Sequence, residues 1–383
     1  GADLVIEEQS WGDLLTKLTT ALPDAENTPD VVELGNTQAP TFTNVGAFSD
    51  VSDLYQELGG AKLLPSFVEA GSVDGKQYAL PYYFGSRYMF VRKDVWSEAG
   101  VAEPTTLDEF NAAVAAVAQA NPRDIKNFSG FFIGGQDWRN GISWIFANGG
   151  DLARKVDGQW QCPLADPNSL KGLEQLQAIY RTASNAPSDA KDQSPWLYIN
   201  DADVVTDANG AVTGKTKLAA ATIMAPGWAH WSIGDLKTVD GKPTREWNDK
   251  KFGVMVLPGN DGKPAPVFAG GSNIAISATS QNQELSRELL KIVFSPEYQQ
   301  LLGKSGLGPA NLDYVSSLGD DQFAAALIAS ASNSKLTPAA PGWAAVESQQ
   351  LMEEFFGKIK DSTDLAALAA EYDAKITPIL NQQ

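Results

Sequence analysis

Few residues in this sequence could do covalent chemistry. It contains one histidine, His230, and one cysteine, Cys162. One histidine excludes a multi-histidine zinc site, and one cysteine excludes an internal disulfide. A Ser-His-Asp relay would need His230, but the sequence has no nucleophile-elbow motif, Walker-type loop or strand-linked GxGxxG. Cys162, beside Pro163 in a polar stretch, lacks the signature of an activated thiol. We therefore expect no enzyme, no cofactor and no metal.

Carboxylates are the one abundant group of reactive side chains, at 47. So many acids guarantee some close pairs, so a secreted glycoside hydrolase or lyase stays an open alternative, although none lies in a recognisable hydrolase motif. Asp201, Asp203 and Asp207 suggest calcium, but their spacing fits no EF-hand loop. Asn209 and Gly210 lie between two short Val/Thr runs, which is typical of a hairpin turn. We therefore interpret the segment around Asp207 as a small hairpin.

The ten tryptophans are unevenly placed. Trp96 and Trp144 have the surroundings of core residues. Others are flanked by Gly, Pro, Asp or Asn, which is typical of an aromatic platform on a cleft wall; these are Trp11, Trp138, Trp228, Trp231 and Trp343. Each of them, taken alone, fits a packing role as well as it fits ligand contact. Together they favour a sugar-like ligand.

A pyranose ring has an apolar face of C–H groups and a rim of hydroxyls. An aromatic plane covers that face, while Asn, Asp, Gln, Arg and backbone N–H groups pair with the hydroxyls. The glycines of the segment 269–273 would let the backbone approach such a ligand, and they also suit a plain bend between lobes. Several dispersed platforms favour a di- or oligosaccharide over a monosaccharide.

Length and charge limit the classes of protein. A chain of 383 residues exceeds the ~250–300 residues at which single cores stop growing, so we expect two lobes. Its hydrophobic fraction of 43% and charged fraction of 20% are those of a globular protein. The net charge of −18 disfavours nucleic acid and anionic membrane surfaces as partners.

Hydrophobic periodicity predicts an α/β chain. Residues 3–8 and 30–34 are expected to be strands around a helix at 12–22, a strand–helix–strand unit that implies a parallel sheet. Asp74-Gly75 predicts a hairpin turn before a long strand that ends near residue 92, and a capping box at Thr106–Glu109 begins a helix. The other predicted helices are 168–183, 282–303, 320–331, 343–360 and 363–380, and the other predicted strands are 218–225, 252–257 and 273–277.

Short motifs in a fixed order extend along nearly the whole chain. They are PDVVEL (29–34), GKQYALPY (75–82), YMFVRKD (88–94), PTTLDEF (104–110), Gly149-Gly150, APGW (225–228), FGVMVLPG (252–259), GGSNIAI (270–276) and FSPEYQ (294–299). In this order and spacing, the sequence resembles the extracellular solute-binding proteins of ABC importers, in the carbohydrate-binding branch that includes maltose-type receptors. Each motif alone is weak, and together they are specific to the family but not to one sugar.

The resemblance implies a two-lobed periplasmic-binding-protein-like α/β fold, with hinge-linked lobes and mixed, partly parallel sheets flanked by helices. One lobe would comprise residues 1–87 and 276–312, and the other residues 88–275 and 313–383. The family usually begins with a strand and a helix before the strand expected at residue 3, so we expect that this segment is absent from the sequence.

The resemblance also carries ligand contacts onto this sequence by position. They are Gln9, Trp11, Asn36, Thr37, Gln38, Tyr83, Gly85, Arg87, Asp137, Trp138, Arg139, Trp228, Gly271, Ser272, Asn273 and Trp343. It implies an oligosaccharide ligand, permease subunits of an ABC importer as partners, no nucleic acid, a monomer, and a place in the periplasm or lipid-anchored on the extracellular face of the cytoplasmic membrane. The same fold binding a peptide or polyamine is a further alternative, which the Asn, Gln and Arg around the platforms disfavour.

Overall fold

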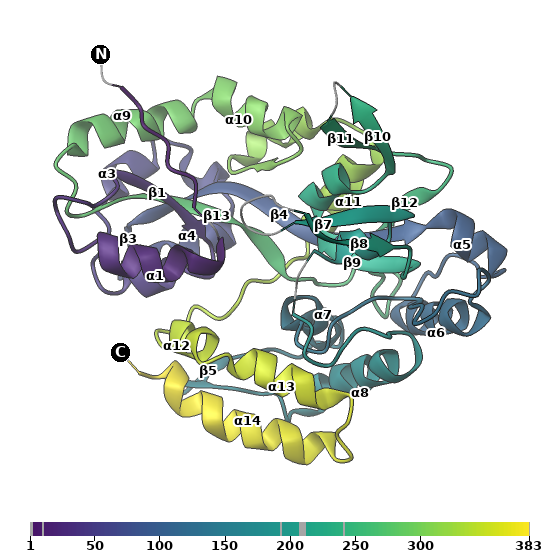
Figure 1. Ribbon diagram of the computed structural model, residues 1–383. Coiled ribbons are helices and arrows are strands. Elements are labelled where there is room, and N and C mark those ends of the chain that lie inside the picture. Colours follow the sequence, from purple (N-terminus) through teal and green to yellow (C-terminus); the bar gives the residue numbers. More distant parts are fainter. Residues whose placement is uncertain (1–2, 10, 192–193, 207–211, 240–241, 383) are drawn as a thin grey trace.

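A long strand, β4 (Ala79–Arg92), is the central element of the fold. The computed structural model describes residues 3–9, 11–191, 194–206, 212–239 and 242–382. β13 (Ala269–Ile276) pairs with residues 79–86 of β4, and β1 (Val31–Gly35) pairs with β13. From Arg87 onward, β4 pairs instead with β9 (Thr222–Pro226) and β12 (Phe252–Met255). β4 therefore joins two halves of one six-stranded sheet, whose sixth strand is β14 (Gly308–Pro309) (Figure 1).

The prediction of partly parallel sheets is wrong for these strands. Every pairing between strands of the described residues is antiparallel. In the part of the chain that the structure describes, parallel pairing is confined to isolated bridges, which join Ser129 to Ala220, Phe132 to Ile223 and Phe268 to Lys335.

The error arises because residues 3–8, which the sequence predicts to be a strand, do not form one. The segment lies outside every sheet, with Leu4, Val5 and Ile6 exposed. The expected parallel partner of β1 is therefore replaced by β13, which returns from a distant part of the chain in the opposite direction. Sequence periodicity does not detect such a long-range pairing, because it records only local alternation.

In the half of the sheet that contains β1, helices cover both faces. On one face, Leu14 and Leu18 of α1 (Trp11–Ala21) pack with Val32 and Leu34 of β1. On the other, Leu290 of α9 (Gln283–Val293) packs against the opposite side of β13. Alternation along β1 and β13 supplies both contacts, since successive side chains point to opposite faces.

The half that contains β9 is layered in the same way. Met89 and Met224 lie in the larger core with α6 (Leu107–Ala120), α7 (Trp138–Ala147), α8 (Pro167–Thr182), α12 (Trp343–Ser348), α13 (Leu351–Ile359) and α14 (Leu365–Leu380). Phe90 and Ile223 face the other way, toward Leu327 of α11 (Gln322–Ala331). The predicted helix at 343–360 is therefore two helices, and the one predicted at 282–303 is likewise divided into α9 and α10 (Pro296–Lys304).

Local signals in the sequence predict several of these elements correctly. Asp74 and Gly75 both have positive φ in the turn between β2 (Ser72–Val73) and β3 (Lys76–Gln77). Thr106 caps α6, with Glu109 completing the predicted capping box. The predicted hairpin near residue 207 is also present as β7 (Ala202–Thr206) and β8 (Val212–Lys217), while Asp207 itself lies outside the described residues.

Short elements complete the fold. The remaining helices are α2 (Ala39–Thr43), α3 (Ser52–Tyr55), α4 (Pro65–Ala70) and α5 (Lys93–Glu98), with 3-10 turns η1 (Gly60–Lys62), η2 (Pro195–Tyr198), η3 (Gly227–Ser232) and η4 (Leu312–Leu318). Two further hairpins are β5 (Arg154–Val156) with β6 (Gln159–Gln161), and β10 (Asp235–Val239) with β11 (Lys242–Glu246). No helix of the described residues has both the length and the apolar character needed to cross a membrane.

Candidate functional site

The junction of β4 and β13 brings several predicted ligand residues together. Tyr83 pairs with Ser272, and Gly85 pairs with Gly270. Gly271 has φ +140, and a Cβ there would lie 2.5 Å from the Tyr83 carbonyl oxygen, so this position requires glycine. A shift of register follows between Ser272 and Asn273. Such an irregularity is a common way to redirect side chains next to a binding site.

The loop after β1 lies against the same junction. The backbone N–H of Asn36 donates to the Gly271 carbonyl at 3.3 Å, and its side-chain amide donates to Ala269 at 3.5 Å. Gln38 accepts the Gly35 N–H at 3.2 Å, and Thr37 between them is half-buried. The predicted loop residues and the predicted β13 residues are therefore neighbours.

Glu33 belongs to this cluster, although the sequence did not identify it. Its carboxylate accepts the Ser272 hydroxyl at 2.7 Å. Burial raises the pKa of Glu33, while hydrogen bonds from Ser272 and Tyr83 oppose that rise. Burial and the nearby Glu33 charge raise the pKa of Tyr83 to about 12. The sequence does contain a signal for Glu33, because it is the one acid inside the apolar run at 31–34.

A polar chain links β4 to the start of α7. Asp137 caps α7 by accepting the Asn140 N–H at 3.2 Å, and the Asn140 amide donates to it at 2.6 Å. Arg87 donates to the side-chain oxygen Oδ1 of Asn140 at 3.0 Å, and its guanidinium lies 5.7 Å from the centre of the Phe268 ring. Two predicted residues, Arg87 and Asp137, therefore meet through Asn140, which sequence reasoning missed.

We use the name α7–α12 wall for Trp138 and Arg139 of α7, Trp343 and Glu347 of α12, and Glu353, which reaches them from α13. Trp138 and Trp343 are 1% and 2% exposed, with ring centres 6.1 Å apart. Their indole N–H groups donate to Glu353 at 3.0 Å and to Glu347 at 2.9 Å, and Arg139 lies 4.4 Å over the Trp138 ring. Neither indole is an open platform in this structure, contrary to the sequence interpretation, so ligand contact by these two rings stays a prediction.

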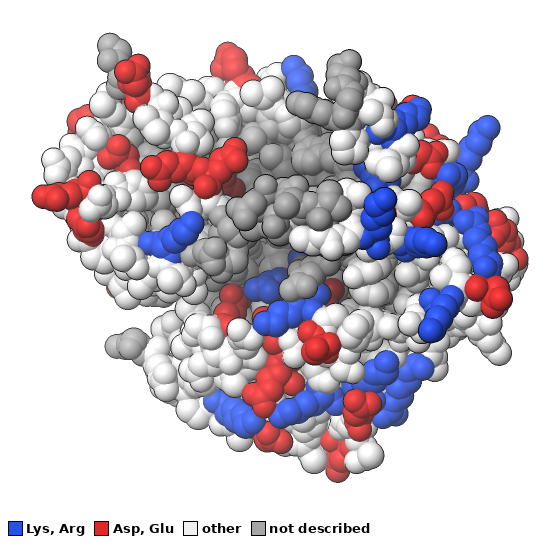
Figure 2. Space-filling model, viewed as in Figure 1, with Lys and Arg blue, Asp and Glu red and all other residues white. Residues whose placement is uncertain are grey.

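This wall approaches the loop after β1. Helix α12, which begins at Trp343, contacts α2, which follows that loop. Figure 2 shows an indentation of the surface between the part that carries α1 and the part that carries α12. The loop after β1 and the start of α12 are therefore close to each other through the contact of α2 with α12.

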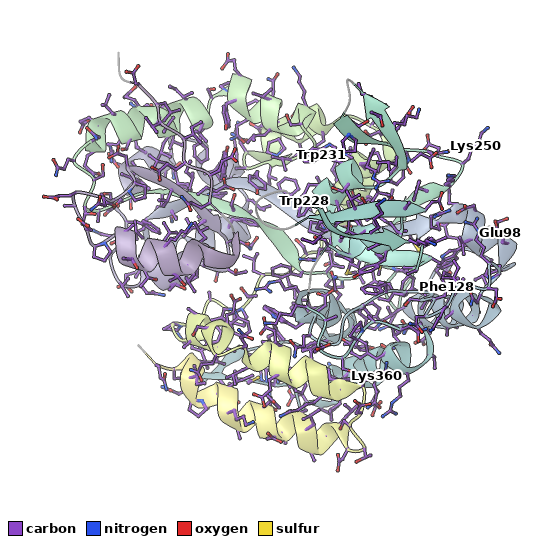
Figure 3. The ribbon with its side chains drawn as sticks, in the orientation of Figure 1. Glu98, Phe128, Trp228, Trp231, Lys250 and Lys360 are labelled. Carbon is purple, nitrogen blue, oxygen red and sulfur yellow. The ribbon has the colours of Figure 1, made fainter. Side chains whose placement is uncertain are left out.

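Among the tryptophans whose side chains the structure describes, Trp228 and Trp231 are exposed, at 39% and 54%. Both lie on η3, which follows β9, and Figure 3 shows Trp231 displaced toward α10 relative to Trp228. The Trp228 ring meets that of Trp196 edge to face, with centres 4.9 Å apart. Because one ring holds it at the edge while much of its surface stays open, Trp228 is a preorganised apolar surface.

Two predicted residues stand apart. Gln9 is exposed and accepts a hydrogen bond from Lys17. Trp11 begins α1, but its side chain lies outside the described part of the chain. The described residues therefore do not connect Gln9 with the cluster at β4 and β13.

The candidate groups for covalent catalysis have unsuitable surroundings. Burial raises the pKa of Cys162 well above its usual value, which disfavours the reactive thiolate. The Nδ1 atom of His230 lies 2.7 Å from the Gly227 carbonyl oxygen, and its ring stacks on Phe323. Within the described ranges, no three His, Cys, Asp or Glu side chains form a group suited to a metal ion. The arrangement suits reversible binding of a polar ligand with apolar faces.

Comparison with known proteins identifies the family. Residues 1–330 match the model of the bacterial extracellular solute-binding protein family. The chain belongs to this family. A solute-binding protein is a receptor and not an enzyme, so the predictions of family and of non-enzymatic function are confirmed.

Individual relatives and solved structures agree with this family. The solute-binding protein is 32% identical to the diacetylchitobiose binding protein DasA of Streptomyces coelicolor, over 90% of this chain and 75% of the relative. Its fold is similar to that of the sugar-binding protein MalE from Xanthomonas citri, with 22% identity and a TM-score of 0.74 over 96% of this chain and 88% of that one. The GacH receptor of Streptomyces glaucescens gives 17% identity and a TM-score of 0.76 over 97% and 88%. These likenesses confirm the periplasmic-binding-protein fold.

Proposed function

We propose that this solute-binding protein binds a di- or oligosaccharide and delivers it to an ABC importer. The observation that carries the proposal is an exposed, edge-held Trp228 beside a polar group: Pro226, two residues before it, pairs with Arg87, which donates to Asn140. An aromatic face covers the C–H side of a sugar ring, while the polar groups pair with its hydroxyls. The relative that binds diacetylchitobiose, at 32% identity, supports a carbohydrate over a peptide or polyamine.

The proposed ligand lies between two lobes, residues 1–87 with 276–312 and residues 88–275 with 313–383. The proposed contacts from the first lobe are Gln9, Trp11, Asn36, Thr37, Gln38, Tyr83, Gly85 and Arg87. Those from the second lobe are Asp137, Trp138, Arg139, Trp228, Gly271, Ser272, Asn273 and Trp343. β4 supports this division, because it pairs with different strands on each side of residue 86.

The proposed mechanism involves no covalent step. The ligand bridges both lobes and so favours the conformation in which they are close, by its difference in affinity for the two states. The closed, monomeric receptor then docks on membrane permease subunits. We place it at the extracellular face of the cytoplasmic membrane, lipid-anchored, or in the periplasm; the extracellular nature of the family supports this.

Calorimetric titration with diacetylchitobiose, and with a panel of other disaccharides, tests the proposal. Trp228→Ala should weaken the binding of the preferred sugar about tenfold, since a lost stacking surface is worth about 1.4 kcal/mol. The matched control is Trp160→Ala, which removes a half-buried indole on β6, outside the proposed set, and should leave the affinity unchanged.

Product analysis in the same samples separates the receptor from the hydrolase alternative. The receptor should return every sugar intact. Release of cleaved sugar at a catalytic rate would overturn the proposal, as would an affinity that Trp228→Ala does not alter.

A further inference from the structure

A second surface on η3 has no part in the proposed site. A cavity of about 220 Å³ lies between η3, the end of α10 and the start of α11, and we call it the Trp231 cavity. Its chemically distinctive lining residues are Tyr88, His230, Trp231, Lys304, Asp321 and Phe323. None of the sixteen predicted ligand residues lines it. It is therefore a separate recess that needs its own explanation.

The aromatic wall of the Trp231 cavity is held in place from behind. The ring centre of His230 lies 4.9 Å from that of Trp231 and 4.5 Å from that of Phe323, on which it stacks. Trp231 nevertheless keeps 54% of its surface exposed, more than Trp228. A large apolar surface that is backed but uncovered is well suited to an apolar ligand face.

Two opposite charges reach the same cavity. Asp321 caps α11, and one carboxylate oxygen accepts the N–H groups of Phe323 at 3.0 Å and Ala324 at 2.8 Å. Lys304 ends α10 on the other side. The salt bridges of the described residues include neither Lys304 nor Asp321. An acceptor and a donor therefore stand at one recess without neutralising each other.

His230 adds a neutral polar group. Burial lowers its pKa, so the imidazole carries no charge at pH 7. With the Nδ1–H donated to Gly227 at 2.7 Å, Nε2 keeps its lone pair as an acceptor. The cavity therefore offers an aromatic plane, a carboxylate, an ammonium and an imidazole acceptor.

We propose that the Trp231 cavity is a second carbohydrate site, which holds a single pyranose ring. The C–H face of the ring would cover Trp231, and its hydroxyls would donate to Asp321 and accept from Lys304. The volume of about 220 Å³ is smaller than the roughly 300–1,000 Å³ of sites that enclose drug-sized ligands, so the recess suits a single ring better than a chain of rings. The site is independent of the proposed function, because it requires no residue of the proposed cleft.

The test is a titration of the intact protein with N-acetylglucosamine and with glucose, followed through the indole N–H signals of the tryptophans by NMR. At least one of the two sugars should shift the Trp231 signal saturably. Trp231→Ala removes this reporter, so calorimetry with the same monosaccharide follows that variant; it should lose monosaccharide binding and keep disaccharide binding elsewhere within twofold. Lys304→Met, which removes only the ammonium, should weaken the event at least fivefold, as seen in the Trp231 signal itself.

Trp228→Ala is the matched control, because it removes the other exposed tryptophan of η3. In Trp228→Ala, the monosaccharide should still shift the Trp231 signal saturably, even if disaccharide binding is lost. A Trp231 signal that neither sugar shifts overturns the second site. A shift that glycine or glutamate produces, and sugars do not, also overturns it and assigns the cavity to a zwitterion. Loss of disaccharide binding alone bears on the proposed function and not on this site.

Discussion

The α7–α12 wall and η3 each carry two tryptophans, and they hold them in opposite ways. On the α7–α12 wall, both rings are buried and both indole N–H groups donate to glutamates from α12 and α13. On η3, Trp228 and Trp231 keep large exposed surfaces and touch their aromatic neighbours only in part. The rings of the α7–α12 wall belong to the largest hydrophobic core, whereas the rings on η3 are exposed to solvent.

The difference shows that polar or turn-forming neighbours along the chain have two meanings for a tryptophan. Around Trp138, the polar neighbours are its packing partners, because Asp137 caps the helix that it begins and Arg139 lies over its ring. The neighbours of Trp228 are turn-forming instead of polar: Pro226 ends β9 and Gly227 begins η3, and the ring stays at the surface. A tryptophan next to such residues is therefore exposed only where no second helix covers it.

The largest expected effect is a difference in the free energy of unfolding between a variant of the α7–α12 wall and a variant of η3. Trp138→Ala should lower the free energy of unfolding of the ligand-free protein by about 3–5 kcal/mol, because it leaves a cavity in a packed core. Trp228→Ala should lower it by about 1 kcal/mol, the value of one aromatic edge contact. Urea denaturation of both variants measures the contrast. Equal losses in the two variants would mean that Trp228 is a core residue and that the comparison fails.

Sequence reasoning succeeded where structure is set locally. The cap at Thr106 and the turn at Asp74-Gly75 depend on residues a few positions apart, so their sequence signals suffice. The pairing of β1 with β13 joins residues about 240 positions apart in the chain, and no local pattern encodes it. The same limit explains why a predicted parallel sheet is antiparallel.

The candidate site was predictable to a similar degree. The order of the motifs predicted that Tyr83, Ser272 and the loop after β1 belong to one site. In the structure they are neighbours. Asn140 and Glu33 were missed because each acts through a partner distant in the chain, Arg87 for Asn140 and Ser272 for Glu33. Whether these residues touch a sugar stays a prediction that the titrations must decide.

A smaller effect tests why Trp138 is held so firmly. Glu353→Ala should lower the free energy of unfolding by about 1–3 kcal/mol, since it leaves the buried indole N–H of Trp138 without its acceptor. Glu353→Gln is the matched control, because its amide oxygen can still accept that N–H. Denaturation of the two variants should show the glutamine variant at least as stable as the parent. A glutamine variant as weak as the alanine variant would show that charge, not hydrogen bonding, holds the wall.

The smallest expected effect is the pH dependence that Glu347 gives the same wall. Burial raises its pKa, against Arg139 and the N–H of Trp343. A carboxyl with a raised folded-state pKa holds its proton more tightly when folded, so its contribution to stability falls as pH rises from about 4.3 through the folded pKa. Glu347→Gln should therefore gain stability relative to the parent across this window and level off above it.

The control for this pH series is Glu371→Gln on α14. The Lys375 ammonium at 2.7 Å lowers the pKa of Glu371, so the sign reverses and this variant should lose relative stability as pH rises. Chemical denaturation between pH 4 and 8 measures both trends. A Glu347→Gln difference that stays constant over this range would mean that the α7–α12 wall is as solvated as an exposed helix surface. The contrast with η3 would then rest on the rings alone, because burial of the carboxylates would no longer distinguish the two walls.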